Sequence, residues 1–422
     1  MRVAPRLAPV AVLAAVTVPA LAPVPANAAP VRALDSVLCD DVGDEVVTTT
    51  APSAPLDRLR IAQAQDLVGG AARAGAGVNV AVLDSGVSRQ GDGVDVVGGT
   101  VVSRGGEIVD PHGTAVASLI AGRPRVDGGP VGIAPAAGIV DVRVYDTLDP
   151  ESHEGELLTP GSLAAGLRWV AANAQQQGIR IANVSLSVPP DDELAAAVQA
   201  VRDAGVLVVA ETGNRGAAGP MEAFPSAVPG EDVARAVFPA GYLDDVIGVN
   251  ATAGGAAAGT DPQLNVGASS ATDVAAPTYG AVVLAVNGSA CTLQDINTSW
   301  AAAEVSGVLA LLMTRYPDDN PAQLTARLFA TASGTMDDPT RMTGYGVVQP
   351  LEALTRPLRP GKDGEYADTT SARDESPRAR APEPEADSLA SLRHTALWAS
   401  ILGGAALVLA LMLRPVLARR RD

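Results

Sequence analysis

Ser299 is the residue of this sequence best placed to act as a nucleophile. It stands where a polar loop gives way to Ala301–Leu312, a run of small and apolar residues that predicts a buried helix. At a helix start, free backbone N–H groups and the positive end of the dipole favour developing negative charge. A serine oxygen held there can attack a carbonyl if a base is near. By itself, this stretch favours a plainer interpretation, a serine that caps a core helix.

A base for Ser299 would have to come from one of three histidines. His394 borders an apolar stretch near the C-terminus, and His153 lies in a polar loop between two acidic residues. His112 begins a second run of small apolar residues, 113–122, and is therefore the only well-placed imidazole base. The alternative is a lone histidine in the core.

Asp84 is the third candidate. Residues 78–87 form a β-branched, apolar run that is typical of a buried parallel strand, and functional residues lie at the carboxyl ends of such strands. Asp84 occupies this position. A turn-forming aspartate before Gly86 is an equally simple interpretation of the residue taken alone.

The remaining pattern alternates strands with helices, which predicts an α/β fold with a parallel sheet and helices on both faces. Leu56–Leu67 is expected to be a short helix, and 88–109 a surface loop. The other expected strands are 139–145, 181–187, 205–210, 246–249 and 274–277, and the other expected helices are 161–177, 194–203, 321–331 and 350–355.

Both ends of the chain differ from this domain. Residues 1–28 have early arginines, an apolar run and Ala26-Asn27-Ala28, which predicts a secretory signal peptide rather than a buried first helix. Residues 29–56 form an acidic, extended N-terminal arm. Residues 357–392 are rich in proline and charge and have too few large apolar residues to fold, so they predict a disordered stalk.

The C-terminal stretch 393–414 is predicted to be a transmembrane helix, with a core helix as the alternative. No charge occurs from Thr395 to Leu413, about 28 Å of helix, which matches a bilayer core. Arg414 and the three arginines in the tail, 415–422, indicate that the C-terminus is cytoplasmic and the domain extracytoplasmic.

Composition restricts the partners and the redox state. A net charge of −17, with no basic stripe, argues against nucleic-acid binding. The two cysteines, Cys39 and Cys291, both fall in the exported region, which favours a disulfide over two buried free thiols. No acidic run has the spacing of a calcium loop, and neither a metal nor a cofactor is expected.

Several short motifs, in this order along the chain, resemble those of the subtilisin-like serine proteases, over residues of about 57–352. The resemblance rests on Val82–Val87, His112-Gly113-Thr114 with Val116-Ala117, Gly132–Ala136, Gly213-Asn214, Ala275–Pro277, and Thr298-Ser299 with Ala301-Ala302 and Val305–Val308. It implies that 57–356 is a subtilisin-like peptidase domain.

The resemblance also implies a role for each site residue. Ser299 would be the nucleophile, His112 its base, and Asp84 the group that fixes the imidazole tautomer. Asn214 and the Ser299 backbone N–H would stabilise the oxyanion; losing such a side-chain donor has been worth about 3–4 kcal/mol in subtilisin itself. The substrate-binding positions would be Ser185, Leu186, Ser187, Glu211, Thr212 and Gly213.

The sequence departs from the family pattern near the site. Asn297 replaces a glycine, a change that asparagine's tolerance of left-handed backbone could allow. Ser187 and Val188 replace two glycines of the substrate-binding strand, so their side chains could narrow the cleft. Glu211 replaces a pocket alanine, where it could favour a basic substrate side chain. A solvent-facing rim residue is the simpler expectation for Glu211.

The order of segments resembles that of the mycosins, the membrane-anchored serine proteases of type VII secretion. This narrower resemblance implies a serine endopeptidase at the cell membrane that cleaves protein or peptide substrates, those of type VII secretion in particular. A type VII secretion membrane complex would be its partner. One alternative is a structural subunit that stabilises the complex with little proteolytic activity. Another is a general surface-degrading protease without a dedicated partner.

Overall fold

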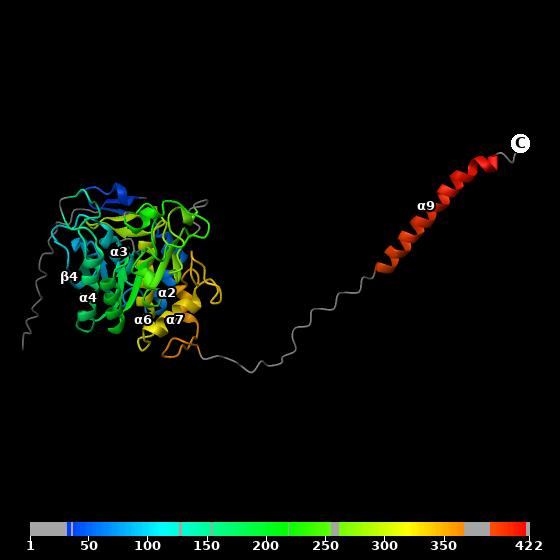
Figure 1. Cartoon of the computed structure of the whole chain (residues 1–422). Helices are drawn as coiled ribbons and strands as arrows, with labels where there is room; N and C mark the ends of the chain where they lie inside the picture. The colour runs from blue at the N-terminus through cyan, green and yellow to red at the C-terminus, as the bar shows by residue number, and fades with distance from the viewer. Residues whose placement is uncertain are drawn as a thin grey trace, which may run out of the picture. The chain divides into compact units, whose positions relative to one another are not determined.

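The computed structural model describes residues 32–34, 37–125, 129–152, 155–217, 219–254, 261–366 and 389–418. The predicted signal peptide, His153, and residues 367–388 of the predicted stalk lie outside the described residues. The chain divides into two compact units, Met1–Ala367 and Asp368–Asp422, and each is considered by itself (Figure 1).

A seven-stranded parallel sheet forms the centre of the first unit, in the order β4-β5-β3-β6-β7-β8-β9. Its strands are β3 (Asn79–Asp84), β4 (Val96–Val101), β5 (Gly138–Arg143), β6 (Ile179–Val184), β7 (Leu207–Glu211), β8 (Ile247–Thr252) and β9 (Val274–Pro277). Side chains alternate between the faces of a strand. Val80 and Val82 of β3 therefore join one buried cluster, and Ala81 and Leu83 the other.

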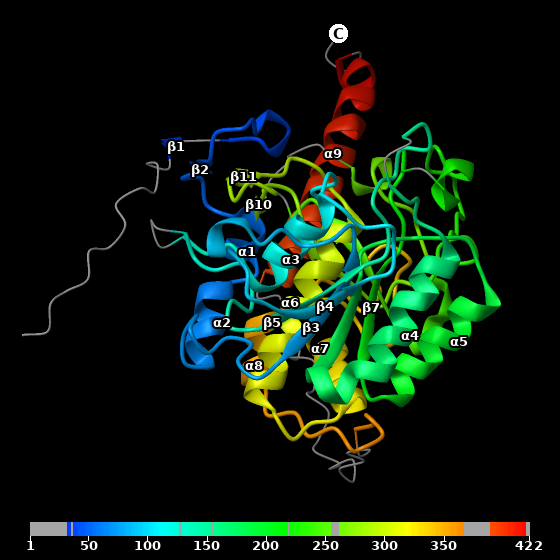
Figure 2. The ribbon, with the colours of Figure 1, turned by 90° about the vertical axis from the view of Figure 1, so that its left-hand side faces the viewer.

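Helices cover both faces of the sheet, so the predicted fold class is confirmed. The apolar residues of α4 (Pro160–Gln177) and α5 (Asp192–Asp203) pack on one face, while those of α3 (His112–Ala121) and α6 (Thr298–Arg315) pack on the other (Figure 2). The shorter helices α1 (Ala54–Arg58), α2 (Ile61–Leu67), α7 (Pro321–Thr331) and α8 (Pro350–Thr355) also contribute to the second face.

Strand β3 marks the point at which the chain changes direction across the sheet. The chain passes from β3 to β4 and β5 on one side, then returns to build β6 to β9 on the other. Ligands of open α/β sheets bind outside the carboxyl ends of the strands at such a switch point. Asp84, the last residue of β3, lies at this position.

Two predictions about local structure were wrong. Residues 88–109 contain the edge strand β4, which was missed because its central glycines, Gly98 and Gly99, weaken the β-branched signal. The helix expected over 56–67 is broken into α1 and α2, because Arg60 has a left-handed backbone with φ 55°.

The N-terminal arm is more regular than its sequence suggests. Its strands β1 (Arg32–Leu34) and β2 (Val47–Thr49) join β11 (Ala290–Thr292) and β10 (Val282–Leu284) in a second sheet. The predicted Cys39–Cys291 disulfide is confirmed, with Cα atoms 4.9 Å apart. The arm is therefore attached to the strand that precedes the Ser299 loop.

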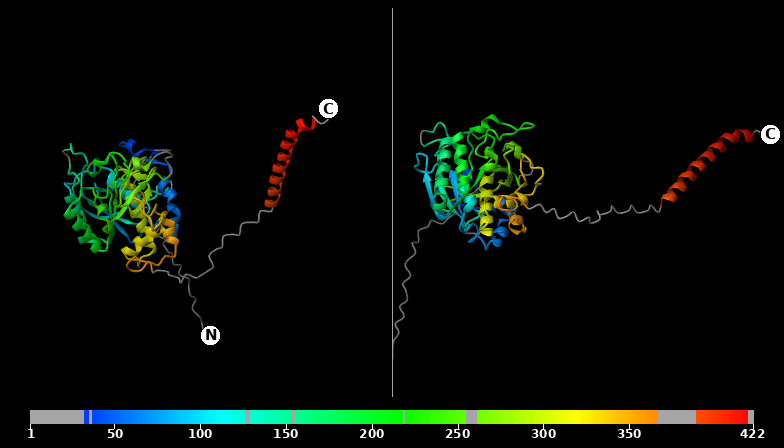
Figure 3. Two further views of the ribbon diagram at one scale, coloured as in Figure 1. Left: turned by 45° about the vertical axis from the view of Figure 1, so that its right-hand side comes forward. Right: turned by 60° about the horizontal axis from the view of Figure 1, so that its bottom comes forward.

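The C-terminal segments differ in their contacts. Residues 357–366, which composition placed in the stalk, hydrogen-bond to α7: Gln323 donates to the Pro360 carbonyl and Arg327 to that of Leu358. In the second unit, α9 (Ala390–Ala418) is one continuous helix (Figure 3). Its part Ala390–Arg414, which contains an 18-residue window with a mean hydropathy of 2.2, is long and apolar enough to cross a membrane.

We predict that removing the disulfide with Cys39→Ser and Cys291→Ser destabilises the peptidase domain. The bond joins residues 252 positions apart. The loop-entropy model gives about 5 kcal/mol for a loop of this length. Denaturant unfolding of the detergent-solubilised chain, followed by tryptophan fluorescence, measures the effect. A reductant should lower the midpoint of the wild type and leave that of the double variant unchanged. Equal midpoints for oxidised wild type and variant would contradict the prediction.

Candidate active site

The structure brings Asp84 and His112 into direct contact. His112 Nδ1 lies 2.9 Å and 3.0 Å from the two carboxylate oxygens of Asp84. The fully buried Asp84 also accepts a hydrogen bond from the Ser85 backbone N–H at 2.8 Å and one from the Tyr145 hydroxyl at 3.4 Å. Because Nδ1 donates to the carboxylate, the neutral imidazole carries its free lone pair on Nε2, as a general base requires.

The start of α3 holds His112 close to β3. The His112 backbone N–H donates to the Asp110 side chain at 2.9 Å. Gly113 is required here, because a Cβ at this position would lie 2.5 Å from the Gly86 carbonyl oxygen. The indole of Trp300 packs against the imidazole with ring centroids 4.8 Å apart. Sequence analysis missed this role of Trp300, although an aromatic residue directly after the candidate nucleophile was a possible signal.

The environment of His112 raises its pKa. Burial lowers the pKa, but the charge and hydrogen bond of Asp84, with the charges of Asp110 and Glu211, outweigh burial and raise it from 6.5 to about 9. The imidazole therefore holds its proton to a higher pH than an ordinary histidine, and it can act as a base only after losing that proton.

Ser299 is the second residue of α6 rather than its cap. Asn297 is the N-cap, and its side-chain oxygen accepts a hydrogen bond from the Ser299 backbone N–H at 2.9 Å. The backbone of Asn297 is extended, with φ −143°. The expectation that asparagine is accepted here for its left-handed tolerance is therefore wrong; it is accepted because it caps the helix.

The Ser299 hydroxyl lies against Glu211. It donates to Glu211 Oε2 at 2.9 Å, and the Asn214 amide donates to Ser299 Oγ at 3.5 Å. Among the hydrogen bonds of the described residues, none joins Ser299 Oγ to His112. Glu211 ends β7 and is only 4% exposed. The expectation of a solvent-facing rim residue is therefore wrong.

Asn214 is fixed beside Ser299 by the first turn of α6. Its side-chain oxygen accepts a hydrogen bond from the Thr298 backbone N–H at 2.7 Å and lies 2.8 Å from the Thr298 hydroxyl oxygen. Gly213 precedes it with φ +111°, a conformation that L side chains rarely adopt. The Asn214 NH2 group is thereby directed toward Glu211 and Ser299.

The residues expected to bind substrate fall into two groups. The buried Ser185 donates to the Ser299 carbonyl at 2.7 Å, and the buried Thr212 donates to the Val249 carbonyl at 3.1 Å, so both support the framework. Leu186 is also buried. Ser187 is partly exposed, and its hydroxyl lowers the pKa of Glu211.

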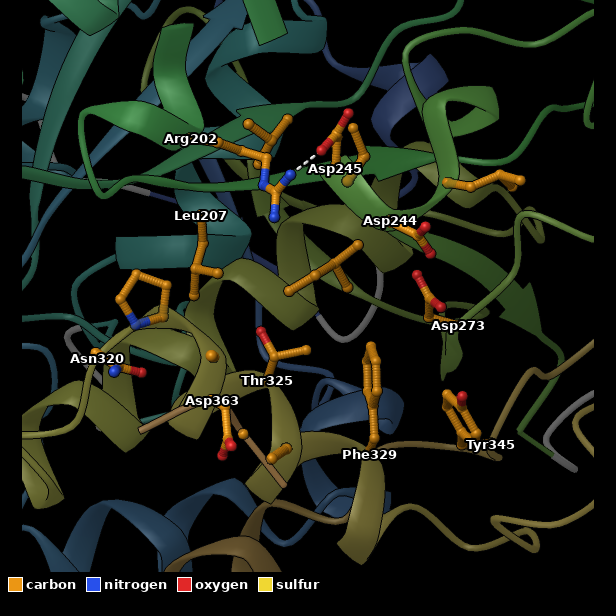
Figure 4. Close-up of a pocket in the computed structure, with 18 of the residues that line it drawn as sticks. Arg202, Leu207, Asp244, Asp245, Asp273, Asn320, Thr325, Phe329, Tyr345 and Asp363 are labelled. Atoms are coloured by element: carbon orange, nitrogen blue, oxygen red, sulfur yellow. Dashed lines mark hydrogen bonds and ion pairs between the residues drawn. The ribbon is translucent and has the colours of Figure 1, made fainter. Parts of the chain in front are cut away.

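A cavity of about 1100 Å³ lies away from this site (Figure 4). It adjoins the amino ends of β7 and β8, at Leu207 and Ile247. Asp84 and Glu211 lie at the carboxyl ends of their strands, on the opposite side of the sheet's length. Figure 4 shows Arg202 paired with Asp245, and Asp273 opposite Phe329 and Tyr345 on its wall. None of the predicted site residues lines it.

The fold is that of the subtilisin-like serine proteases. The profile of the subtilase family, Peptidase_S8, matches residues 75–346, and the chain belongs to this family.

The relatives include mycosins and bacterial alkaline proteases. Mycosin-1 of Mycobacterium tuberculosis is 34% identical over 68% of this chain and 70% of its own length. M-protease of Shouchella clausii is 32% identical over 74% of this chain and 73% of its own. The structure of the MycP3 protease from the type VII (ESX-3) secretion system is 28% identical, with a TM-score of 0.58, over 76% of this chain and 91% of that chain.

We predict that His112 titrates with a midpoint near 9, well above the ordinary value of 6.5, because Asp84 stabilises the imidazolium. NMR titration of the histidine rings in the full chain measures it. Asp84→Asn should move the midpoint downward, whereas the exposed control Asp92→Asn should leave it in place. A wild-type midpoint at or below 6.5 would contradict the assignment.

Proposed function

We propose that this chain is a membrane-anchored, extracytoplasmic serine endopeptidase that hydrolyses peptide bonds through an acyl-enzyme. Asp84, His112 and Ser299 form its catalytic triad, and Asn214 lies in its oxyanion hole. The observation that carries the proposal is the contact of His112 Nδ1 with the Asp84 carboxylate at 2.9 Å. This contact lies at the carboxyl ends of the parallel strands, as Ser299 does.

Each residue then has a defined step. The Ser299 hydroxyl turns to His112, whose Nε2 takes its proton as Oγ attacks the substrate carbonyl carbon. Asn214 Nδ2 and the Ser299 backbone N–H stabilise the negative oxygen of the tetrahedral intermediate. His112 returns the proton to the leaving amine, and water then releases the acyl group by the same route. Asp84 stabilises the imidazolium in both halves.

The organisation of the chain supports an external protease attached to the membrane. We infer that 1–28 is removed as a signal peptide, that 29–56 braces the domain through Cys39, and that 57–356 carries the catalysis. The stalk 357–392 joins the domain to the span 393–414, and 415–422 is cytoplasmic. Ala390–Arg414 has the length and apolar composition of a membrane span, and the arginines at its end favour this orientation.

Mycosin relatives support a more specific role. Among the similar structures, MycP3 is described as a protease from a type VII secretion system, and another, 25% identical, as an essential component of one. We propose that this chain processes substrates of such a system and associates with its membrane complex.

We predict that a membrane-impermeant fluorophosphonate labels the full chain in intact spheroplasts. An activated serine outside the membrane is required for this reaction. Labelling is read on gels as probe fluorescence at the mass of the chain. Ser299→Ala and His112→Ala should abolish it, and Ala substitution of the exposed Ser226 should leave it unchanged.

The pattern of labelling separates activity from orientation. Label that appears only after the spheroplasts are lysed would refute the extracytoplasmic domain. Label that persists in Ser299→Ala would refute Ser299 as the nucleophile. Absence of label in a folded wild type, with or without lysis, would favour a structural subunit.

We also predict that Ser299→Ala prevents processing of at least one secreted protein while retaining secretion itself. The substitution removes one hydroxyl and leaves the surface of the domain intact, so it separates proteolysis from assembly. Mass spectrometry of culture filtrates compares the wild type, Ser299→Ala and a deletion strain. Unaltered cleavage patterns in Ser299→Ala, together with lost secretion in the deletion strain, would favour the structural alternative.

A further inference from the structure

Glu211 occupies the centre of the proposed catalytic site. Its Oε2 accepts hydrogen bonds from the Asn214 amide at 2.7 Å, the Thr298 hydroxyl at 2.8 Å and the Ser299 hydroxyl at 2.9 Å. A carboxylate oxygen carries partial negative charge, as does the oxygen of a tetrahedral intermediate. Glu211 therefore engages the same Asn214 NH2 group that would stabilise that intermediate.

The second oxyanion donor is also engaged within the chain. The Ser299 backbone N–H donates to the Asn297 side-chain oxygen at 2.9 Å. The two donors are therefore both hydrogen-bonded to side chains of the chain itself.

The position of Glu211 makes this contact persistent. It is the last residue of β7, and its backbone pairs with Val249 in β8. Hydrogen bonds to a charged acceptor are stronger than neutral ones, and more so in a site shielded from water. Burial raises the pKa of the Glu211 carboxyl above its ordinary value, because it outweighs the hydroxyls of Thr298, Ser299 and Ser187 and the charge of His112, which lower it.

We propose that Glu211 is an internal competitor for the catalytic groups: its carboxylate holds the Ser299 hydroxyl and the Asn214 amide in the free enzyme and must leave them before acylation. The inference rests on the proposed protease function. A negative oxygen cannot form next to an ionised Glu211 without repulsion. A productive substrate is one whose binding moves the Glu211 side chain away, so Glu211 limits acylation by poorly fitting peptides.

The test compares fluorophosphonate labelling rates of the wild-type full chain and Glu211→Ala at pH 7. Removing the carboxylate frees Ser299 Oγ to face His112, and we expect labelling to become about 10- to 100-fold faster, the factor for one hydrogen bond to a charged group. Glu304→Gln is the matched control. Glu304 is another fully buried glutamate, on α6, and neither of its oxygens is hydrogen-bonded in the described structure.

A second measurement distinguishes competition from a structural effect. The charges that face His112 are those of Asp84, Asp110 and Glu211, and the Tyr145 hydroxyl lies beside the first two. Glu211→Gln keeps the shape but removes one negative charge, so the rise of labelling rate with pH should shift to lower pH. It should stay in place in Glu304→Gln.

The outcomes are separable from those of the proposed function. Faster labelling of Glu211→Ala supports the inference. Label that appears only in this variant supports it too, and it then shows that an unlabelled wild type carries a competent serine that Glu211 blocks, and is not a structural subunit. A labelled wild type with equal or slower labelling of both Glu211 variants, at unchanged thermal midpoints, overturns the inference and leaves the protease function intact. No label in the wild type, Glu211→Ala or Glu211→Gln overturns both.

Discussion

The structure depends on burying the first turn of α6 at the carboxyl edge of the sheet. A helix start has unsatisfied N–H groups, and burial makes each of them expensive unless a partner is present. Asn214 Oδ1 accepts a hydrogen bond from the Thr298 backbone N–H, and Asn297 Oδ1 accepts one from the Ser299 backbone N–H. The Ser185 hydroxyl donates to the Ser299 carbonyl. The contacts that satisfy the buried start of α6 are the same contacts that fix the position of Ser299.

Two buried carboxylates then set the electrostatics around that serine. Asp84 contacts the imidazole of His112 and raises its pKa, while Glu211 accepts a hydrogen bond from the Ser299 hydroxyl. Both are stable in the interior because several donors reach each of them. Their placement puts one negative charge beside the imidazole and another acceptor beside the Ser299 hydroxyl.

The disulfide and the second sheet extend this arrangement toward the N-terminus. Cys291 lies in β11, only a short loop before Asn297, and its bond to Cys39 attaches the arm to that loop. The arm is therefore joined covalently to the segment that leads to Ser299. The disulfide holds one end of the segment from Cys291 to Thr298, and the buried start of α6 holds the other end.

The sequence alone determined the sheet, most of its strands, the disulfide and the candidates Asp84, His112, Asn214 and Ser299. Periodicity and short motifs are local, so they can be recognised without knowing what packs against them. Only the tertiary structure decided that Glu211 accepts a hydrogen bond from Ser299, 88 residues away. The same is true of the packing of Trp300 on His112 and of the capping of α6 by Asn297. Such contacts depend on which side chains meet at one sheet edge, and no local pattern encodes that.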